Sequence, residues 1–329
     1  MTRPARFPSS PRLAVSAVVL LLGAVATADA PVFRAETRLV MLHVTVRNAR
    51  GELVTDLGQD GFSVYENGKP QAIAQFRRDD VPVSLGLLLD NSGSMRKLRP
   101  RMEQAALACV RASNPQDEVF VLDFADKARV DVPFTSDPRV LEAGIARADS
   151  IGGTAMLDAL DAGASYLSRD GERDRKVLLL ITDGNDNASV TSMDEVRKEV
   201  EQHDVVIFAI GLLTEEASSV ARHAQHELGR LAELSGGVAY YETGPEDLEA
   251  TALSIARQIR SQYTIGYVPS DRSLDGSFRK LRVVARGRER LSVQTRAGYR
   301  AVPPPPDRAE PAARRSQEGG GASAPPGRP

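Results

Sequence analysis

Cysteine, tryptophan and aromatic residues in general are scarce in this chain. Its 329 residues include one cysteine and no tryptophan, and aromatic residues make up 5%. With Cys109 alone, an intramolecular disulfide and a cysteine-ligated metal cluster are both excluded. The shortage of aromatic side chains argues against a surface on which nucleotide bases or sugars stack.

The chain also lacks an excess of charge of either sign. It has 42 Lys+Arg and 44 Asp+Glu, for a formal net charge of -2. Nucleic-acid binding depends mainly on clustered basic charge, so we expect no nucleic acid among the partners. Hydrophobic residues at 42% and charged residues at 26% are typical of globular proteins, which excludes wholesale disorder. Residues 302–329 are rich in proline, glycine and alanine and have no apolar pattern, so we predict a disordered tail there.

The first thirty residues have the pattern of a secretory signal peptide. Three arginines precede an apolar run over residues 13–26, and the small residues Ala28 and Ala30 follow it. We therefore predict a signal peptide over residues 1–30 that is cleaved after Ala30. The run has about 14 residues, fewer than the roughly 20 that a membrane-spanning helix needs, although an uncleaved N-terminal anchor stays an alternative. We expect the mature protein to be secreted or periplasmic, without a transmembrane segment.

The two segments that flank the middle of the chain favour β structure. Residues 40–47 alternate between apolar and other side chains, which predicts a strand. Asn67-Gly68 after an apolar stretch is the typical turn of a β-hairpin. Strand patterns return near the C-terminus at residues 263–268, 281–285 and 291–295. We predict that an N-terminal β segment, residues 31–80, and a C-terminal β segment, residues 262–301, form one β-sandwich-like unit.

The middle of the chain, residues 81–261, has a different pattern. Nearly continuous apolar runs suit parallel strands that are buried on both faces, and they cover residues 83–89, 119–124, 177–181 and 205–210. Apolar residues at helical spacing lie between these runs, over residues 95–110 and 157–167. This alternation predicts an α/β domain with a doubly wound, mostly parallel sheet that is flanked by helices.

Polar motifs follow two of the predicted strands and precede one predicted helix. Asp90-Asn91-Ser92-Gly93-Ser94 ends the first strand, Thr182-Asp183-Gly184 ends the third, and Gly152-Gly153-Thr154 comes before a helix. Open parallel sheets bind ligands at the carboxyl ends of strands, where the strand order reverses. We therefore expect two carboxylates and three hydroxyls to meet at one sheet edge: Asp90, Asp183, Ser92, Ser94 and Thr154.

These five side chains offer only oxygen donors. Hard oxygen ligands favour Mg²⁺, with Mn²⁺ or Ca²⁺ also possible, over zinc or copper. Two carboxylates neutralise a divalent cation, and the hydroxyls add no charge. Mg²⁺ takes about six ligands, so a position is left for water or for an acidic group of a partner.

The five residues resemble the metal-ion-dependent adhesion site (MIDAS) of von Willebrand factor type A (VWA) domains. The pattern of that family is D-x-S-x-S, then a distant Thr and a distant Asp, and all positions match here. The resemblance covers residues 81–261 and implies that Ser92, Ser94 and Thr154 contact the metal. It also implies that Asp90 and Asp183 act directly or through water.

The flanking β segments resemble those of the bacterial VWFA-related proteins of the Acidobacterial type. The resemblance is carried by "VTDLGQDGFSVYENGKPQAIAQF" before the α/β domain and by "YTIGYVPS" and "RKLRVVARGRERLSVQTRAGYRA" after it. That group is defined mainly by its architecture, so the resemblance does not identify a ligand.

Several of these features have simpler interpretations. The polar turn after Asp90 has the residue types that cap a helix, here one that begins near Met95. His223 and His226 are expected to be an exposed pair, and Cys109 a buried inert thiol. The basic residues between 278 and 290 fit an exposed sheet face.

We expect a binding module rather than an enzyme. A divalent cation at the MIDAS would bridge to an acidic group of a protein partner. Two alternatives remain open: a Mg²⁺-dependent hydrolase, and a scaffold whose metal only stabilises the fold. The sequence has no G-x-S-x-G motif and no G-x-x-x-x-G-K motif, which counts against hydrolytic and nucleotide chemistry.

Overall fold

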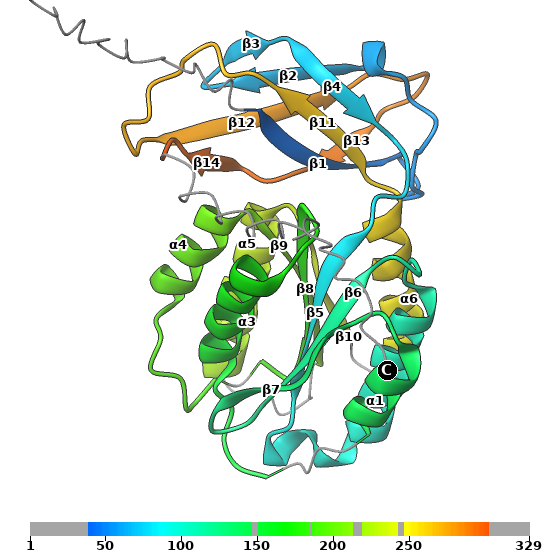
Figure 1. Cartoon of the computed structure of the whole chain (residues 1–329), viewed down its shortest axis with the longest axis vertical. Helices are drawn as coiled ribbons and strands as arrows, with labels where there is room; N and C mark the ends of the chain where they lie inside the picture. The colour runs from blue at the N-terminus through cyan, green and yellow to red at the C-terminus, as the bar shows by residue number, and fades with distance from the viewer. Residues whose placement is uncertain (1–38, 147–150, 185, 213–218, 243–246, 303–329) are drawn as a thin grey trace, which may run out of the picture. The chain divides into compact units, whose positions relative to one another are not determined.

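The computed structural model describes residues 39–146, 151–184, 186–212, 219–242 and 247–302 (Figure 1). The predicted signal peptide, residues 1–30, and all but the first residue of the predicted tail lie outside the described residues. Within the described residues, no helix combines the length and the apolar character that crossing a membrane requires.

A six-stranded sheet forms the centre of the α/β domain, in the order β10-β9-β8-β5-β6-β7. Neighbouring strands are parallel except for β7, which runs antiparallel to β6. The strands are β5 (Val83–Asp90), β6 (Glu118–Phe124), β7 (Ala128–Thr135), β8 (Arg175–Thr182), β9 (Val205–Leu212) and β10 (Ala239–Glu242). The predicted doubly wound, mostly parallel sheet is therefore confirmed, whereas β7 and β10 were not predicted.

Helices cover both faces of this sheet (Figure 1). One face carries α1 (Arg99–Ala112), α2 (Pro138–Ile145) and α6 (Leu248–Arg260); the other carries α3 (Met156–Asp170), α4 (Met193–His203) and α5 (Ser219–Ser235). Successive strand residues point to opposite faces, so Leu87 joins the core under α1 and α6, and Leu88 joins the core under α3. Two cores explain why the strands are apolar at nearly every position.

The flanking segments form two four-stranded sheets, with the orders β13-β1-β11-β4 and β14-β12-β2-β3. The strands are β1 (Val40–Arg47), β2 (Phe62–Glu66), β3 (Lys69–Gln71), β4 (Ile73–Arg77), β11 (Tyr263–Tyr267), β12 (Phe278–Ala285), β13 (Ser292–Gln294) and β14 (Gly298–Arg300). N-terminal strands pair with C-terminal ones: Val44 lies opposite Tyr263, and Val64 opposite Val283. The prediction that both flanks build one β-sandwich-like unit is confirmed.

The predicted hairpin connects β2 to β3. Asn67 and Gly68 both adopt positive φ, 48° and 80°. Two consecutive left-handed residues are the requirement of a type I′ turn, whose twist matches that of the strands it joins.

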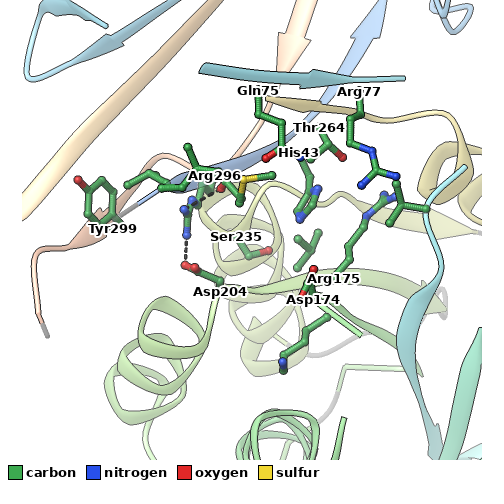
Figure 2. A pocket seen from close by; sticks show the side chains of 16 residues that line it. His43, Gln75, Arg77, Asp174, Arg175, Asp204, Ser235, Thr264, Arg296 and Tyr299 are labelled. Atoms are coloured by element: carbon green, nitrogen blue, oxygen red, sulfur yellow. Dashed lines mark hydrogen bonds and ion pairs between the residues drawn. The ribbon is translucent and has the colours of Figure 1, made fainter. Parts of the chain in front are cut away.

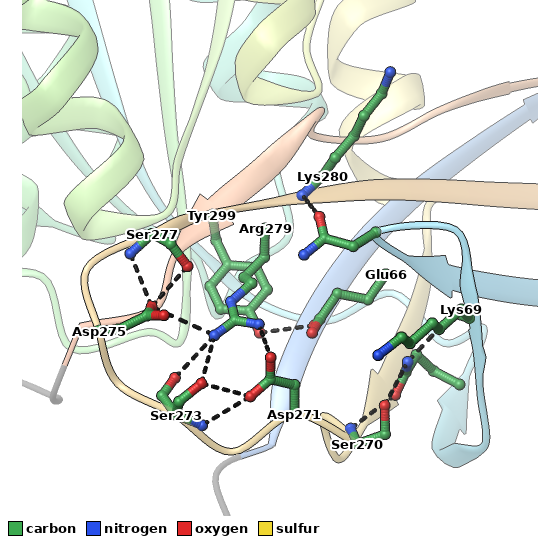
Figure 3. Close-up of polar contacts among 12 residues, drawn as sticks. Glu66, Lys69, Ser270, Asp271, Ser273, Asp275, Ser277, Arg279, Lys280 and Tyr299 are labelled. Atoms are coloured by element: carbon green, nitrogen blue, oxygen red, sulfur yellow. Dashed lines mark hydrogen bonds and ion pairs between the residues drawn. The ribbon is translucent and has the colours of Figure 1, made fainter.

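A buried arginine organises the loop that leads into β12 (Figure 3). The guanidinium of Arg279 pairs with the carboxylate of Asp271 and donates to Ser273 Oγ at 2.9 Å and to Asp275 Oδ1 at 3.4 Å. The hydrogen bond from Arg279 holds the pKa of Asp271 well below its usual range, and bonds from Ser273 add to this effect. The hydrogen-bond acceptors of the loop thus surround the guanidinium of Arg279.

The position of Arg279 corrects one expectation from the sequence. The basic residues between 278 and 290 were expected on an exposed sheet face, and Lys280 and Arg282 do lie there. Arg279 is buried instead, because it lies on the same face of β12 as the buried Leu281 and Val283, whereas Phe278 is exposed. The acceptors of the preceding loop compensate the buried charge.

Replacing Gly86 with alanine is expected to destabilise the α/β domain by about 1–3 kcal/mol, the usual cost of overpacking a core. Gly86 lies in β5, and a Cβ there would overlap the Phe120 ring and come within 2.6 Å of Leu178 Cδ2. Urea unfolding should show the loss as a lower midpoint. In the control Gly61→Ala, the added Cβ has its nearest neighbour at 3.4 Å and should change little. Equal midpoints for Gly86→Ala and the parent would contradict the prediction.

Candidate metal centre

The candidate centre lies where the strand order of the parallel sheet reverses. From β5 the chain continues to β6 on one side, and it later returns to β8 on the other side of β5. The parallel register aligns Leu89 with Ile181, which places Asp90 and Thr182 side by side at the carboxyl ends of β5 and β8. This is the position at which open α/β sheets bind ligands.

Asp90 is the innermost of the candidate ligands, with 0% of its surface exposed. Its Oδ1 accepts the backbone N–H of Ser92 at 2.9 Å, and its Oδ2 accepts the hydroxyl of Thr182 at 2.6 Å. Burial raises the pKa of Asp90 to about 6; hydrogen bonds from Ser92 and Thr182 oppose this rise, and the negative charge of Asp183 adds to it. The position therefore disfavours an uncompensated carboxylate and suits one that faces a cation.

The serines after Asp90 do not serve as a helix cap. Ser92 precedes a 3₁₀ helix, Gly93–Lys97, but its side chain makes no capping hydrogen bond. Instead, Ser92 Oγ lies 3.0 Å from Ser94 Oγ, with Ser92 buried and Ser94 exposed. The α-helix α1 begins at Arg99, followed by Pro100, rather than near Met95. Proline is favoured in the first turn of a helix, which accounts for this later start.

Backbone hydrogen bonds join the loop of Thr154 to the loop of the two serines. Gly93 N donates to Gly152 O at 3.1 Å, and Ile151 N donates to Asn91 O at 3.0 Å. Gly152 has a φ of 102°, which side-chain-bearing residues rarely adopt. Thr154 is thereby held at the same sheet edge as Asp90, and it is buried.

Sequence reasoning missed Asp126, which together with Asn187 holds the Thr154 loop in place. Asp126 Oδ1 accepts from Gly153 N at 2.7 Å, and Asn187 Oδ1 accepts from Thr154 N at 2.9 Å. A Cβ on Gly153 would come within 2.7 Å of Asn187 Oδ1, so glycine is required for this close approach. Asp126 lies just beyond the carboxyl end of β6, and the rule that located Asp90 could have located it as well.

Asp183 follows β8 and lies on the outer side of the centre. It is half-buried, its charge acts on Asp90, and its carbonyl oxygen accepts from Gln225 Nε2 at 3.4 Å. Gly184 after it has a φ of 76°, and its N–H donates to Thr182 Oγ1 at 3.0 Å. All five residues proposed from the sequence thus lie at one edge of the sheet, around Asp90.

The chemistry of this donor set fits a hard divalent cation. Two carboxylates and three hydroxyls contribute oxygen only. No group of three or more His, Cys, Asp or Glu side chains suited to a metal occurs among the described residues. His223 and His226 are exposed on α5, and Cys109 is buried, which raises the pKa of its thiol to about 12.

Comparisons with known proteins show what this chain is similar to. Residues 85–185, which include all five candidate ligands, match the family model of the von Willebrand factor type A domain. No curated protein matches the chain. A solved von Willebrand factor type A structure from Catenulispora acidiphila is 14% identical, covers 82% of this chain and 75% of that one, and has a TM-score of 0.49.

Two further solved structures match this chain. Proximal thread matrix protein 1 from the mussel byssus, with a zinc-occupied MIDAS motif, is 20% identical and covers 59% of this chain and 49% of that one, at a TM-score of 0.48. An aerotolerance-related membrane protein from Bacteroides fragilis, carrying multiple mutations to serines, is 17% identical and covers 54% of this chain and 98% of that one, at a TM-score of 0.44.

The raised pKa of Asp90 predicts a pH dependence of stability in the metal-free protein. Between about pH 4 and pH 6 the folded state holds a proton on Asp90 that the unfolded state has lost, so the free energy of unfolding should fall as the pH rises. A shift from 3.8 to about 6 corresponds to roughly 3 kcal/mol. Urea unfolding of the parent and of Asp90→Asn should be measured across this pH range. The Asp90 contribution should appear as a difference between the two proteins in the slope of the free energy of unfolding against pH. Parallel curves for the two proteins would contradict the prediction.

Proposed function

The chain carries a von Willebrand factor type A domain, and we propose that it is an exported binding module in which a divalent cation joins this domain to an acidic group of a protein partner. One observation carries the proposal: two serine hydroxyls left unused by helix capping lie with a buried carboxylate at the sheet edge. A structural turn would have used those hydroxyls for the helix N-terminus.

The burial of the five residues suggests how such a site would work. Asp90, Ser92 and Thr154 are buried and would form its floor, whereas Ser94 is exposed and Asp183 half-buried, at its rim. By the family resemblance, the three hydroxyls would contact the cation and the two carboxylates would act directly or through water. The carboxylates balance a divalent charge without exceeding it, so the cation keeps its attraction for an anionic oxygen from outside.

Mg²⁺ is the cation that we propose first, with Mn²⁺ and Ca²⁺ as the other candidates. The donors are all oxygen, and they include neither imidazole nor thiolate, the ligands that select zinc and copper. Hydroxyl ligands are neutral, which suits a site that must accept one more negative ligand. The partner would supply that ligand as an aspartate or glutamate side chain.

Binding fits the site better than catalysis does. A serine nucleophile needs a base to take its proton. Among the described residues, neither Ser92 nor Ser94 forms a hydrogen bond with a histidine. A Mg²⁺-dependent hydrolase and a metal that only stabilises the fold remain the two competing functions. Metal titration followed by competition with an acidic ligand separates all three.

Metal titration of the full chain tests the site itself. Mg²⁺, Mn²⁺ or Ca²⁺ should raise the melting temperature of the parent saturably, because a ligand that binds only the folded state stabilises it. Asp183→Ala and Ser92→Ala should abolish the rise while the circular dichroism spectrum of the metal-free protein is unchanged. Asp60→Ala removes an exposed carboxylate of the β-sandwich and serves as the matched control. An equal rise in parent and Asp183→Ala, or loss of secondary structure in the metal-free variants, would contradict the assignment.

An acidic peptide then distinguishes a binding site from a structural one. If the cation bridges to a partner, a short peptide with one glutamate should bind only with metal present, and its glutamine counterpart should not. Stabilisation by metal without metal-dependent binding of any acidic peptide would favour the structural function. Metal-dependent hydrolysis of a phosphate ester, lost in Asp183→Ala, would favour the hydrolase.

Export of the chain rests on its first thirty residues and has its own test. We propose cleavage after Ala30, so mass spectrometry of the protein exported by a bacterial host should find Pro31 at the new N-terminus. Replacing the residue before the cut, Ala30→Arg, should block processing, since the cleavage site requires small residues. Recovery of the exported chain with residues 1–30 still attached would instead support the uncleaved anchor.

A further inference from the structure

A second site lies at the opposite ends of the same parallel strands. A cavity of about 510 Å³ separates the first residues of the α/β strands from the sheet that contains β1, β4 and β11 (Figure 2). Arg175 and Val206 line it from the starts of β8 and β9, and His43, Arg77 and Thr264 line it from the β-sandwich. None of the five candidate metal ligands lies among its lining residues.

The lining of this cavity is cationic. Four of the described lining residues are basic and two are acidic: Arg77, Arg175, Lys176, Arg296, Asp174 and Asp204. Arg296 forms an ion pair with Asp204 at one end and donates to Met41 O at 2.8 Å. Asp174 is exposed at the surface. The cavity therefore keeps a positive field around Arg175 and Arg77.

Arg175 is the most unusual of these residues because it is 1% exposed and forms no ion pair with the described residues. Its Nη2 donates to Ile259 O and to Gln262 Oε1, both neutral acceptors, and its Nε has no hydrogen-bond partner in the described part of the chain. Burial lowers the pKa of Arg175 to about 10, a shift that the negative charges of Asp80 and Asp117 oppose. A buried guanidinium that lacks a counter-ion is costly, and an anion in the cavity would supply one.

Two other lining side chains have hydrogen-bonding atoms without a partner. Within the described residues, His43 Nδ1 and Thr264 Oγ1 are buried and form no hydrogen bond. The His43 side chain is half-buried. Its ring faces the cavity, which accounts for its exposed surface (Figure 2). Native proteins rarely leave buried polar atoms unpaired, and the unpaired atoms around this cavity are available to a polar ligand.

Figure 2 shows Arg77 and Arg175 extending into the cavity from its two walls, with the ring of His43 near Arg175. Arg77 ends β4, is exposed, and forms no side-chain hydrogen bond or ion pair with the described residues. Guanidinium groups bind carboxylates through pairs of parallel hydrogen bonds. Two such groups, one buried and one at the rim, form a receptor for one carboxylate.

Most of the other lining residues are apolar, and Gln75, Ser235 and Tyr299 are the polar ones among them. The apolar lining residues are Leu39, Val40, Met41, Val81 and Val206. A cavity of about 510 Å³ lies within the 300–1,000 Å³ range of small-molecule sites. Its occupant therefore combines an anionic head with a compact apolar body.

We propose that this cavity binds a small organic carboxylic acid, with its carboxylate between Arg77 and Arg175 and its apolar body against Met41, Val81 and Val206. His43 and Thr264 provide further hydrogen bonds to the polar end. This site is separate from the metal centre, and it does not depend on the proposed function.

Benzoate and benzyl alcohol, which differ in the carboxylate, are the probes. Binding is followed on the full-length Asp183→Ala variant in metal-free buffer, so that no carboxylate binds through a metal. Benzoate should shift the ring signals of His43 saturably in the NMR spectrum and leave those of His203, His223 and His226 unchanged. Benzyl alcohol should produce no saturable shift. Equal binding of the two probes, or no saturable shift of His43 with benzoate, would overturn the proposal.

Substitutions at the rim test which residues bind the carboxylate. Arg77→Gln, at an exposed position, should weaken benzoate binding by about tenfold or more, the usual effect of losing a charge-assisted hydrogen bond. Arg78→Gln, the matched control, removes an exposed arginine that does not line the cavity. Thr264→Val should weaken binding less than Arg77→Gln does. Unchanged affinity in Arg77→Gln, or equal losses in Arg77→Gln and Arg78→Gln, would overturn the assignment.

Discussion

The candidate centre depends on one buried carboxylate at the point where the parallel sheet divides. Asp90 ends β5 and accepts hydrogen bonds from Ser92 in its own loop and from Thr182 at the end of β8. These two bonds tie the serine loop to β8, the strand that Asp183 follows. The loop of Thr154 is then attached through Gly93 and Gly152. Because Asp90 is buried beside Asp183, the arrangement favours either a proton or a cation at this position.

Strand direction places the two proposed sites at opposite ends of one sheet. β8 begins with Arg175, which lines the cationic cavity, and ends with Thr182, which bonds Asp90. These two residues are the ends of an eight-residue strand, seven steps apart, or roughly 23 Å at about 3.3 Å per step. Because the parallel strands share this polarity, the starts of β8 and β9 line the cavity, and the ends of β5 and β8 carry the metal centre. An anion site and a cation site can therefore exist in one domain without competing for charge.

Much of the α/β domain was predictable because its strands are buried on both faces. Such strands are apolar throughout, which identified β5, β6, β8 and β9 from short stretches of sequence. β7 escaped prediction because it is an edge strand with mostly half-exposed residues, and it contains Pro133. Arg279 was misplaced because its burial depends on a loop that supplies the compensating acceptors, which the alternation of β12 does not reveal.

The sequence by itself determined the fold class and the chemistry of the metal centre, because strand periodicity and donor type are local properties of the chain. It did not reveal the contacts that Asp126 and Asn187 make with the Thr154 loop, which span 27 and 33 residues. Only the tertiary structure decided the cationic cavity. Its residues come together because β1 pairs with β11 across more than two hundred residues, which leaves Arg175 buried opposite Arg77 without a counter-ion. Such long-range pairing depends on which surfaces meet in three dimensions, and no local pattern specifies it.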